Sequence, residues 1–162
     1  MIFVTLGSQK FQFNRLLQKI DELLEKGVIS ESVYAQVGES TYIPKHYEYT
    51  DFMDREAFAE KMNACDKVIT HGGTGVIINA VKKGKKVIAV PRLARYKEHV
   101  DDHQLQLLHQ FDDLKLICAC YEVEHLEECC KNIDRMEFRE YVSNTHVIID
   151  SIEEYLGTID KR

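Results

Sequence analysis

Residues 66–104 constrain the fold of this chain more than any other stretch. They read DKVITHGGTGVIINAVKKGKKVIAVPRLARYKEHVDDHQ. Residues 67–70 are a short apolar run typical of a buried strand, and residues 76–83 have helical spacing. Gly84 is placed to end that helix, and residues 86–90 predict the next strand. Strand, glycine-rich turn, helix and strand together indicate one βαβ unit.

The turn inside this unit is suited to an anion. It consists of His71, Gly72, Gly73, Thr74 and Gly75. It should lie at the carboxyl end of a strand, where open α/β sheets bind ligands. The amide groups and dipole of the following helix attract a phosphate there. Glycines let the backbone approach that anion without Cβ clashes. The same pattern also suits a tight turn without a ligand, so the pattern alone leaves both interpretations open.

A second strand, turn and helix open the chain. Residues 2–6 predict the first strand, and apolar residues repeat at helical spacing from position 13 to position 24. Gly7, Ser8 and Gln9 form the turn between them. Gly7 permits close backbone approach, and the hydroxyl group of Ser8 is either a donor to a ligand or part of an ordinary turn.

The remaining residues continue the alternation of strands and helices. Strands are expected at 33–37, 47–52 and 114–119, and helices at 54–63 and 99–111, with closing helices over about 122–156. This order predicts an α/β fold, a Rossmann-like three-layer domain with a parallel sheet covered on both faces. We expect a single domain over residues 1–162. The wide apolar stripe after residue 137 packs on the sheet or serves a partner.

Composition excludes several classes of function. The 162 residues are 44% hydrophobic and 30% charged, as in an ordinary globular protein, and the net charge of −6 argues against a nucleic-acid partner. Neither a membrane span nor a signal peptide is evident, so we expect a cytoplasmic protein. Five cysteines without a CxxC pair favour buried reduced thiols over a metal site.

Three stretches carry a resemblance to a known family. They are MIFVTLGSQKFQFNRLL, the glycine-turn unit, and PRLARYKEHVDDHQLQL. Together they resemble the donor-binding half of the GT-B glycosyltransferases, in particular the glycosyltransferase family 28 C-terminal domain. They are similar to small bacterial exopolysaccharide or capsule glycosyltransferase subunits. They are more distantly similar to the soluble subunit of the eukaryotic two-part UDP-GlcNAc transferase. The resemblance covers most of the chain to about residue 108.

The resemblance implies a function and a partner. It implies the C-terminal half of a GT-B fold, acting as the donor-binding subunit of an inverting, UDP-sugar-dependent hexosyltransferase. The acceptor would be a lipid-linked precursor of a surface polysaccharide, and no cofactor or metal is expected beyond the donor. A membrane-associated subunit would bind the acceptor, supply the general base and hold this chain at the inner face of the membrane. The alternative is a nucleotide-sugar-binding or regulatory subunit without turnover of its own.

The resemblance also assigns residues. It places Gly7, Ser8 and Gln9 at the donor diphosphate. It implies that Asp102 and Gln104 bind hydroxyl groups of the transferred sugar. From the residues alone, Gln104 could instead satisfy a buried backbone group. The acidic residues at this helix start could simply complement the helix dipole.

Ribose and phosphate recognition stay open. The family reads ribose with a glutamate where this chain has Asn79, so either Asn79 or Glu98 is the candidate. Arg92 and Arg95 are candidate cations for the diphosphate, or surface arginines. His71 points a ring nitrogen at the phosphate or only packs under the turn. No general base can be identified.

Overall fold

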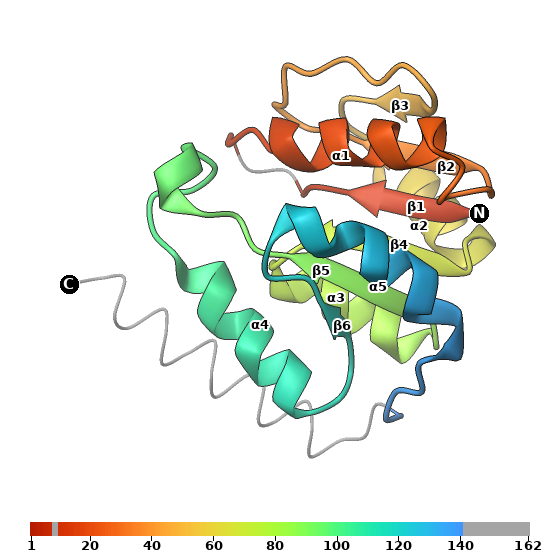
Figure 1. Cartoon of the computed structure of the whole chain (residues 1–162), viewed down its shortest axis with the longest axis vertical. Helices are drawn as coiled ribbons and strands as arrows, with labels where there is room; N and C mark the ends of the chain where they lie inside the picture. Colours follow the sequence, from red (N-terminus) through yellow and green to blue (C-terminus); the bar gives the residue numbers. More distant parts are fainter. Residues whose placement is uncertain (8–9, 141–162) are drawn as a thin grey trace.

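Six parallel strands form the sheet around which the chain is built (Figure 1). The computed structural model describes residues 1–7 and 10–140. Across the sheet the strand order is β3-β2-β1-β4-β5-β6. The strands are β1 (Ile2–Thr5), β2 (Val33–Gln36), β3 (Glu48–Thr50), β4 (Lys67–His71), β5 (Lys86–Val90) and β6 (Cys118–Ala119). The predicted α/β class with a parallel sheet is therefore confirmed.

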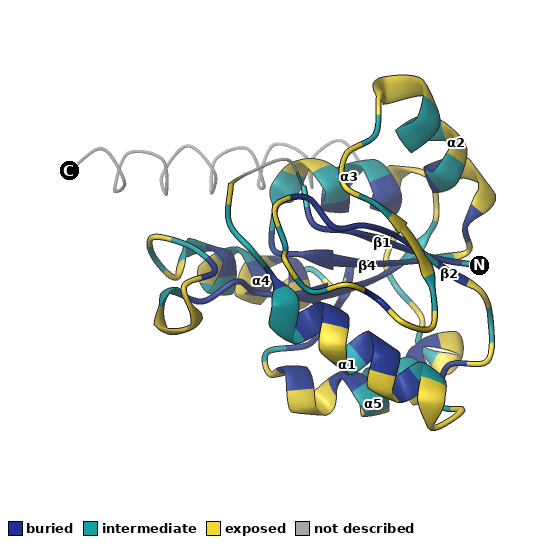
Figure 2. Ribbon diagram, turned by 90° about the horizontal axis from the view of Figure 1, so that it is seen from above, coloured by how far each residue is buried: buried dark blue, intermediate teal, exposed yellow. Residues whose placement is uncertain are grey.

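Helices cover both faces of this sheet (Figure 2). They are α1 (Asn14–Glu25), α2 (Arg55–Ala64), α3 (Thr74–Lys82), α4 (His103–Asp113) and α5 (Leu126–Asn132). Helices α1 and α5 lie on one face, and α2 and α3 lie on the other. Helix α4 packs on the α3 side, where Leu108 and Phe111 join the same buried cluster as Ile77. This arrangement leaves the ends of the strands as the places where loops can form a site.

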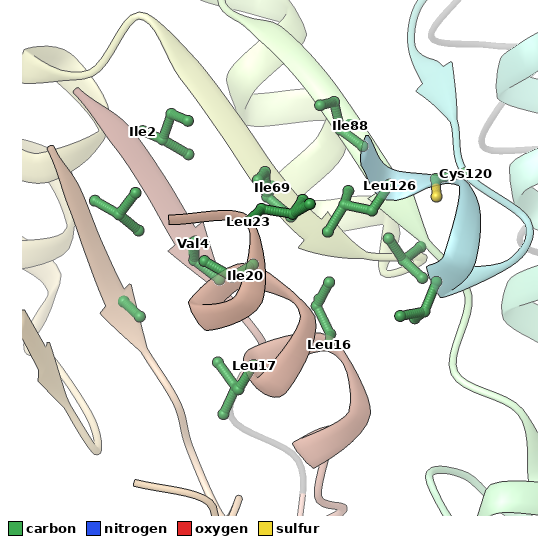
Figure 3. Close-up of a cluster of buried hydrophobic side chains, with 14 of the residues drawn as sticks. Ile2, Val4, Leu16, Leu17, Ile20, Leu23, Ile69, Ile88, Cys120 and Leu126 are labelled. Atoms are coloured by element: carbon green, nitrogen blue, oxygen red, sulfur yellow. The ribbon is translucent and has the colours of Figure 1, made fainter. Parts of the chain in front are cut away.

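The alternation of side chains along each strand builds two cores. In β1, Ile2 and Val4 face α1, whereas Phe3 faces the opposite cluster. Figure 3 shows the first core, in which Leu16 and Ile20 of α1 pack against the strands. Because both faces are buried, the strands carry continuous apolar runs, as the sequence predicts.

Local signals set most helix ends. The carboxylate of Asp54 accepts a hydrogen bond from the amide of Ala57 at 2.7 Å, which caps α2 as expected. Helix α3 ends before Gly84, whose φ of 72° lies in the left-handed region that glycine adopts most easily.

Several predicted boundaries were wrong. Strand β6 has two residues rather than six, because Lys115 takes a left-handed φ of 57° and the chain turns there into the core. Helix α4 begins at His103 rather than at residue 99. The helix expected over residues 122–133 is divided into the 3-10 turn η2 (Val123–His125), α5 and the 3-10 turn η3 (Ile133–Arg135). Residues 137–140 are not helical, and the rest of the last expected helix lies outside the described residues.

The cysteines largely follow expectation. Cys65, Cys118 and Cys120 are free and buried, whereas Cys129 and Cys130 are free and only half buried. Within residues 1–7 and 10–140, no group of three or more His, Cys, Asp or Glu side chains is placed to hold a metal ion. In the same residues, no helix has both the length and the apolar character needed to cross a bilayer.

Candidate functional site at the carboxyl ends of β1 and β4

The order of the strands creates a switch point between β1 and β4. From β1 the chain proceeds outward through β2 and β3, then returns to place β4 on the other side of β1. In open α/β sheets the loops at such a switch point run in opposite directions, and ligands bind in the crevice between them. The crevice of this fold is therefore expected between the carboxyl ends of β1 and β4. Gly7 follows β1, and Gly72 follows β4. The two turns that the sequence singles out meet at this crevice.

Close packing explains the glycines at three of these positions. A Cβ atom on Gly7 would lie 2.8 Å from Nε2 of His71, and one on Gly73 would lie equally close to the same atom. A Cβ atom on Gly72 would lie 2.7 Å from Cβ of Gln104. The ring of His71 thus lies between the two turns, and side chains on either turn would displace it.

Gly75 is different. A Cβ atom there would meet nothing within 4 Å. Gly75 is the second residue of α3, so it borders open space beside the start of that helix. The first amide groups of an α-helix have no partners within the helix and carry the positive end of its dipole. Packing within the described residues gives no reason for glycine at this position.

The contacts of His71 define which of its nitrogens carries the proton. Oε1 of Gln104 accepts hydrogen bonds from the backbone amides of Gly72 at 3.0 Å and Arg92 at 3.1 Å. The other amide atom of Gln104 must therefore be the NH₂ group, which lies 3.0 Å from Nδ1 of His71. Nδ1 accepts this bond, so the proton is on Nε2.

The His71 ring is also kept neutral. Burial, with the nearby positive charge of Arg92 as the second cause, lowers the pKa of His71 from 6.5 to about 3. Nε2 has no hydrogen-bond partner among the residues that the structure describes. At neutral pH the ring therefore presents one N–H donor toward the space between the two glycine turns.

Arg92 stabilises the turn after β1 by hydrogen bonds to backbone carbonyl groups. Its guanidinium group donates to the carbonyl oxygens of Leu6 at 2.5 Å and Phe11 at 2.9 Å, on either side of the turn after β1. Its side chain is only 1% exposed, so of the two interpretations of Arg92 the structure contradicts the surface arginine. Within the described residues, Nε of Arg92 is a buried donor without a partner. Arg92 thus brings a buried positive charge to the crevice while it fixes the turn.

Glu98 is not the solvent-facing carboxylate that ribose recognition would require. It is fully buried, and its two oxygens pair with Nε and Nη2 of Arg15, both at 3.0 Å. One of these oxygens also accepts the amide of Leu93 at 3.1 Å. The structure therefore contradicts Glu98 as the ribose ligand, because its acceptor capacity is used to join the β5–α4 loop to α1.

The structure also corrects the role predicted for Gln104. Its oxygen and nitrogen contact Gly72, Arg92 and His71, and the residue is buried. Of the two interpretations of this glutamine, the structure supports the one in which it satisfies buried backbone groups. Gln104 orients the turn and the His71 ring instead of presenting its amide to a sugar.

The other candidates occupy three different places. Asn79 is half buried on α3, and no hydrogen bond of its side-chain amide is found in the described part of the chain. Asp102 accepts the amide of Ala94 at 2.9 Å, and the guanidinium group of Arg95 lies 4.8 Å from the centre of the Tyr96 ring. Both belong to the β5–α4 loop, on the side facing β6. Ser8 and Gln9 lie outside the described residues.

Sequence reasoning missed the residues that join the two loops. Nε2 of Gln12 donates to the carbonyl oxygens of Tyr96 and Lys97 at 3.0 and 3.3 Å. The rings of Phe11 and His99 pack with their centres 5.1 Å apart. These pairs are more than 80 positions apart in sequence, and no local pattern identifies them. Together with the bonds of Arg92 and Glu98, they hold the β1–α1 segment and the β5–α4 loop in one arrangement.

Comparison with known sequences gives the family. The model of the glycosyltransferase family 28 C-terminal domain matches residues 1–153, and the chain belongs to this family. A UDP-N-acetylglucosamine transferase subunit, ALG13 of Kluyveromyces lactis, is 33% identical over 86 residues, which are 52% of this chain and 41% of the relative. ALG13 of Mus musculus is 27% identical over 137 residues, covering 73% of this chain and 10% of the relative. The chain thus spans less than half of either relative.

Solved structures agree on the fold. The glycotransferase of kitacinnamycin superposes with a TM-score of 0.60 and 13% identity over 97% of this chain and 39% of that one. MurG of Acinetobacter baumannii superposes with a TM-score of 0.51 and 15% identity, and the superposition covers 93% of this chain and 49% of MurG. The six-stranded domain therefore matches the C-terminal half of the GT-B glycosyltransferases, as the sequence predicts.

Proposed function

We propose that the crevice between β1 and β4 binds the diphosphate of a UDP-sugar. The observation that carries this proposal is the neutral His71 ring, whose Nε2–H faces the space between two glycine turns. Beside it, the start of α3 adds the positive end of a helix dipole and amide groups that have no acceptor within the helix itself. The buried charge of Arg92 attracts an anion without contacting it. These groups fit a dianionic ligand far better than an apolar one.

We further propose that this binding serves sugar transfer. The chain would be the donor-binding subunit of an inverting glycosyltransferase that adds a hexose to a lipid-linked precursor of a surface polysaccharide. Donors fixed around the diphosphate would stabilise the charge that develops on the leaving UDP. Support comes from membership of the family 28 C-terminal domains and from relatives that are themselves named as transferase subunits.

The proposal includes a membrane-associated partner that binds the acceptor. A general base must reach the proton of the acceptor hydroxyl. The titratable groups of the crevice are poorly suited to act as that base, because His71 already carries its proton on Nε2 and Glu98 is held in a buried ion pair. A partner subunit would supply the base and keep this chain at the cytoplasmic face of the membrane.

The same observation favours one alternative, a nucleotide-sugar-binding subunit without turnover. A crevice with donors for a diphosphate but without a base could bind and present a UDP-sugar or regulate another enzyme. Both functions share the binding site, so binding alone does not separate them.

Reconstitution separates the two. Purified chain should transfer little sugar from UDP-hexoses to a lipid-linked acceptor, and co-expression with a membrane-associated subunit encoded beside it should restore transfer. UDP binding without any transfer by the assembled pair would favour the regulatory function. Robust turnover by the chain alone would contradict the two-subunit proposal.

A further inference from the structure

Three cysteine side chains come together where β6 packs on α5. Cys118 lies on β6, and the amide of Cys120 donates to the carbonyl oxygen of Ala89 at 2.9 Å, so the chain still runs beside β5 there. Residues two apart on a strand face the same side of the sheet. Both thiols are accordingly buried in the core that α1 and α5 cover, where Figure 3 labels Cys120.

Helix α5 brings a third thiol onto this pair. Leu126 is fully buried, and Cys129 lies three positions later, on the same face of the helix. Cys129 is half buried and packs against the cluster that contains Cys118 and Cys120. Its thiol group is within hydrogen-bonding distance of both of theirs. One half-buried thiol therefore lies against two that are enclosed.

The surroundings make Cys129 the most reactive of the three. Hydrogen bonds from the thiols of Cys118 and then of Cys120 lower the pKa of Cys129, and the nearby His125 adds to this effect. The same bonds, together with burial, raise the pKa of Cys118 and of Cys120. Because the thiolate is the nucleophilic form of cysteine, the more accessible sulfur is also the better nucleophile.

Two kinds of chemistry could use such a cluster, a metal site or a disulfide. Within residues 1–7 and 10–140, no group of three or more His, Cys, Asp or Glu side chains is placed to hold a metal ion. A disulfide needs only two of the three sulfur atoms. In compartments that keep thiols reduced, disulfides are usually transient and redox-sensing. The cluster therefore fits an oxidation site better than a metal site.

We propose that Cys129 is a hydroperoxide-reactive thiol that forms a reversible disulfide with Cys118 or Cys120. The thiolate of Cys129 attacks one oxygen of hydrogen peroxide and the O–O bond breaks, which leaves a sulfenic acid and releases hydroxide. A thiol of Cys118 or Cys120 then attacks this sulfur. The S–S bond forms, the S–O bond breaks, and the hydroxyl group leaves with the thiol proton as water. The two sulfur atoms lose two electrons, and the peroxide gains them.

The test treats the full chain with hydrogen peroxide and then measures its free thiols after unfolding. One disulfide should lower the number from five to three, since it consumes two thiols. A protease that cleaves after glutamate separates Cys118 and Cys120 from Cys129, because Glu122 and Glu128 lie between them. Mass spectrometry should find these two peptides joined, and dithiothreitol should separate them again.

Matched variants assign the reaction to Cys129. Cys129→Ser should keep its four remaining thiols in peroxide, whereas Cys130→Ser should still form the disulfide. Cys130 is the matched control because it is also half buried on α5. Burial raises its pKa, and it borders a different cavity, beside Ile2 and Ile133. The peptide map of the wild type needs no variant, so the test remains valid if Cys129→Ser does not fold.

The rate of the reaction separates an activated thiol from an ordinary one. A cysteine with a pKa of about 8.5 should react roughly 80-fold more slowly at pH 6 than at pH 8, in proportion to its thiolate fraction. We expect the rate at Cys129 to fall less than about threefold over this range.

Four results would each overturn the proposal. They are a thiol count that stays at five, a disulfide through Cys130, a sulfinic acid on Cys129 without a disulfide, and the pH dependence of an ordinary thiol. The reaction requires no UDP, so its failure would leave the proposed function standing. Equally, a chain that does not bind UDP could still form the disulfide.

Discussion

The two ends of the parallel sheet use their polar side chains in different ways. At the carboxyl end, His71, Arg92, Glu98 and Gln104 are all buried and bonded to one another or to backbone groups. Burying such groups is costly unless each is satisfied. Two apolar cores cover the sheet, and burial of apolar surface does not explain why so many polar groups are buried at this end.

At the amino end, polar groups remain near the surface. Lys85 donates to the carbonyl oxygens of Asn63 and Cys65 at the end of α2, at 3.0 and 2.7 Å. Lys86 does the same at the carbonyl oxygens of Ile133 and Asp134, at 3.2 and 3.0 Å. These lysines satisfy helix ends while they stay partly in water. The difference suggests that the amino end serves the fold and that the carboxyl end serves a ligand.

The largest effect on stability should come from Glu98. Glu98→Ala leaves the guanidinium group of Arg15 and the amide of Leu93 without partners, which we expect to cost about 3–5 kcal/mol in the free energy of unfolding. Glu98→Gln keeps the shape and should cost less. Urea unfolding measures both. A loss below about 1 kcal/mol for Glu98→Ala would show that this end of the sheet is not held together as described.

Gln104 should affect UDP and UDP-sugars equally. Gln104→Ala removes the hydrogen bond that orients His71 and leaves the backbone amides of Gly72 and Arg92 without partners. We expect this to weaken the binding free energy of each ligand by about 1–3 kcal/mol. Calorimetry with UDP and with UDP-hexoses should show the same loss for both ligands. A loss confined to UDP-hexoses would return Gln104 to the role of reading sugar hydroxyls.

His71 should make stability depend on pH. Its pKa is about 3 in the folded chain and near 6.5 when unfolded, so between these values the unfolded state binds more protons. The stabilisation is complete above pH 6.5 and is lost as the pH falls toward 3, by up to about 1.4 kcal/mol per pH unit. His71→Gln removes this contribution. The measurement is the free energy of unfolding of the wild type and of His71→Gln as a function of pH. The difference between the two curves removes the contribution of the carboxylates, which both proteins share. If the two curves run parallel from about pH 6 to 4, the His71 ring is not buried in its neutral form.

The amino end should give the smallest effect. Lys85→Met removes a cation from the carboxyl end of α2 and should cost about 0.5–1 kcal/mol. UDP affinity should not change. A loss of UDP affinity in this folded variant would break the functional separation of the two ends.

The elements that the sequence predicted well are those with strong local patterns. The glycine turn between β4 and α3 was found from an apolar run, three glycines and a helical stripe. The extent of β6 was overestimated because Leu116 and Ile117 are apolar and buried yet precede the pairing with β5. An apolar run predicts burial, whereas the ends of a strand depend on which of its residues pair with the neighbouring strand.

The site was predicted less completely than the fold. His71 and the glycines of its turn are neighbours in the sequence, so their proximity in the fold could be predicted from the sequence. The roles of Arg92, Glu98 and Gln104 depend on partners that are distant in the sequence. Each of these three side chains was a candidate ligand-binding group, and each is hydrogen-bonded within the protein. Sequence spacing cannot show which hydrogen-bond capacity remains free after folding.

Gly75 is the position at which binding of a UDP-sugar diphosphate in the crevice can be tested with least disturbance of the fold. Substitution at Gly72 or Gly73 would also disturb Gln104 or His71, whereas a side chain at position 75 enters open space. Leucine favours a helix over glycine by roughly 0.8 kcal/mol, so Gly75→Leu should fold at least as stably as the wild type.

The decisive measurement is calorimetric titration of UDP into the wild type, Gly75→Leu and the control Glu56→Leu, which lies in the exposed first turn of α2. We expect UDP binding by the wild type and the control, and at least about tenfold weaker binding by Gly75→Leu, equivalent to about 1.4 kcal/mol. Equal UDP affinity in Gly75→Leu, or no UDP binding by the wild type, would contradict a diphosphate site in the crevice.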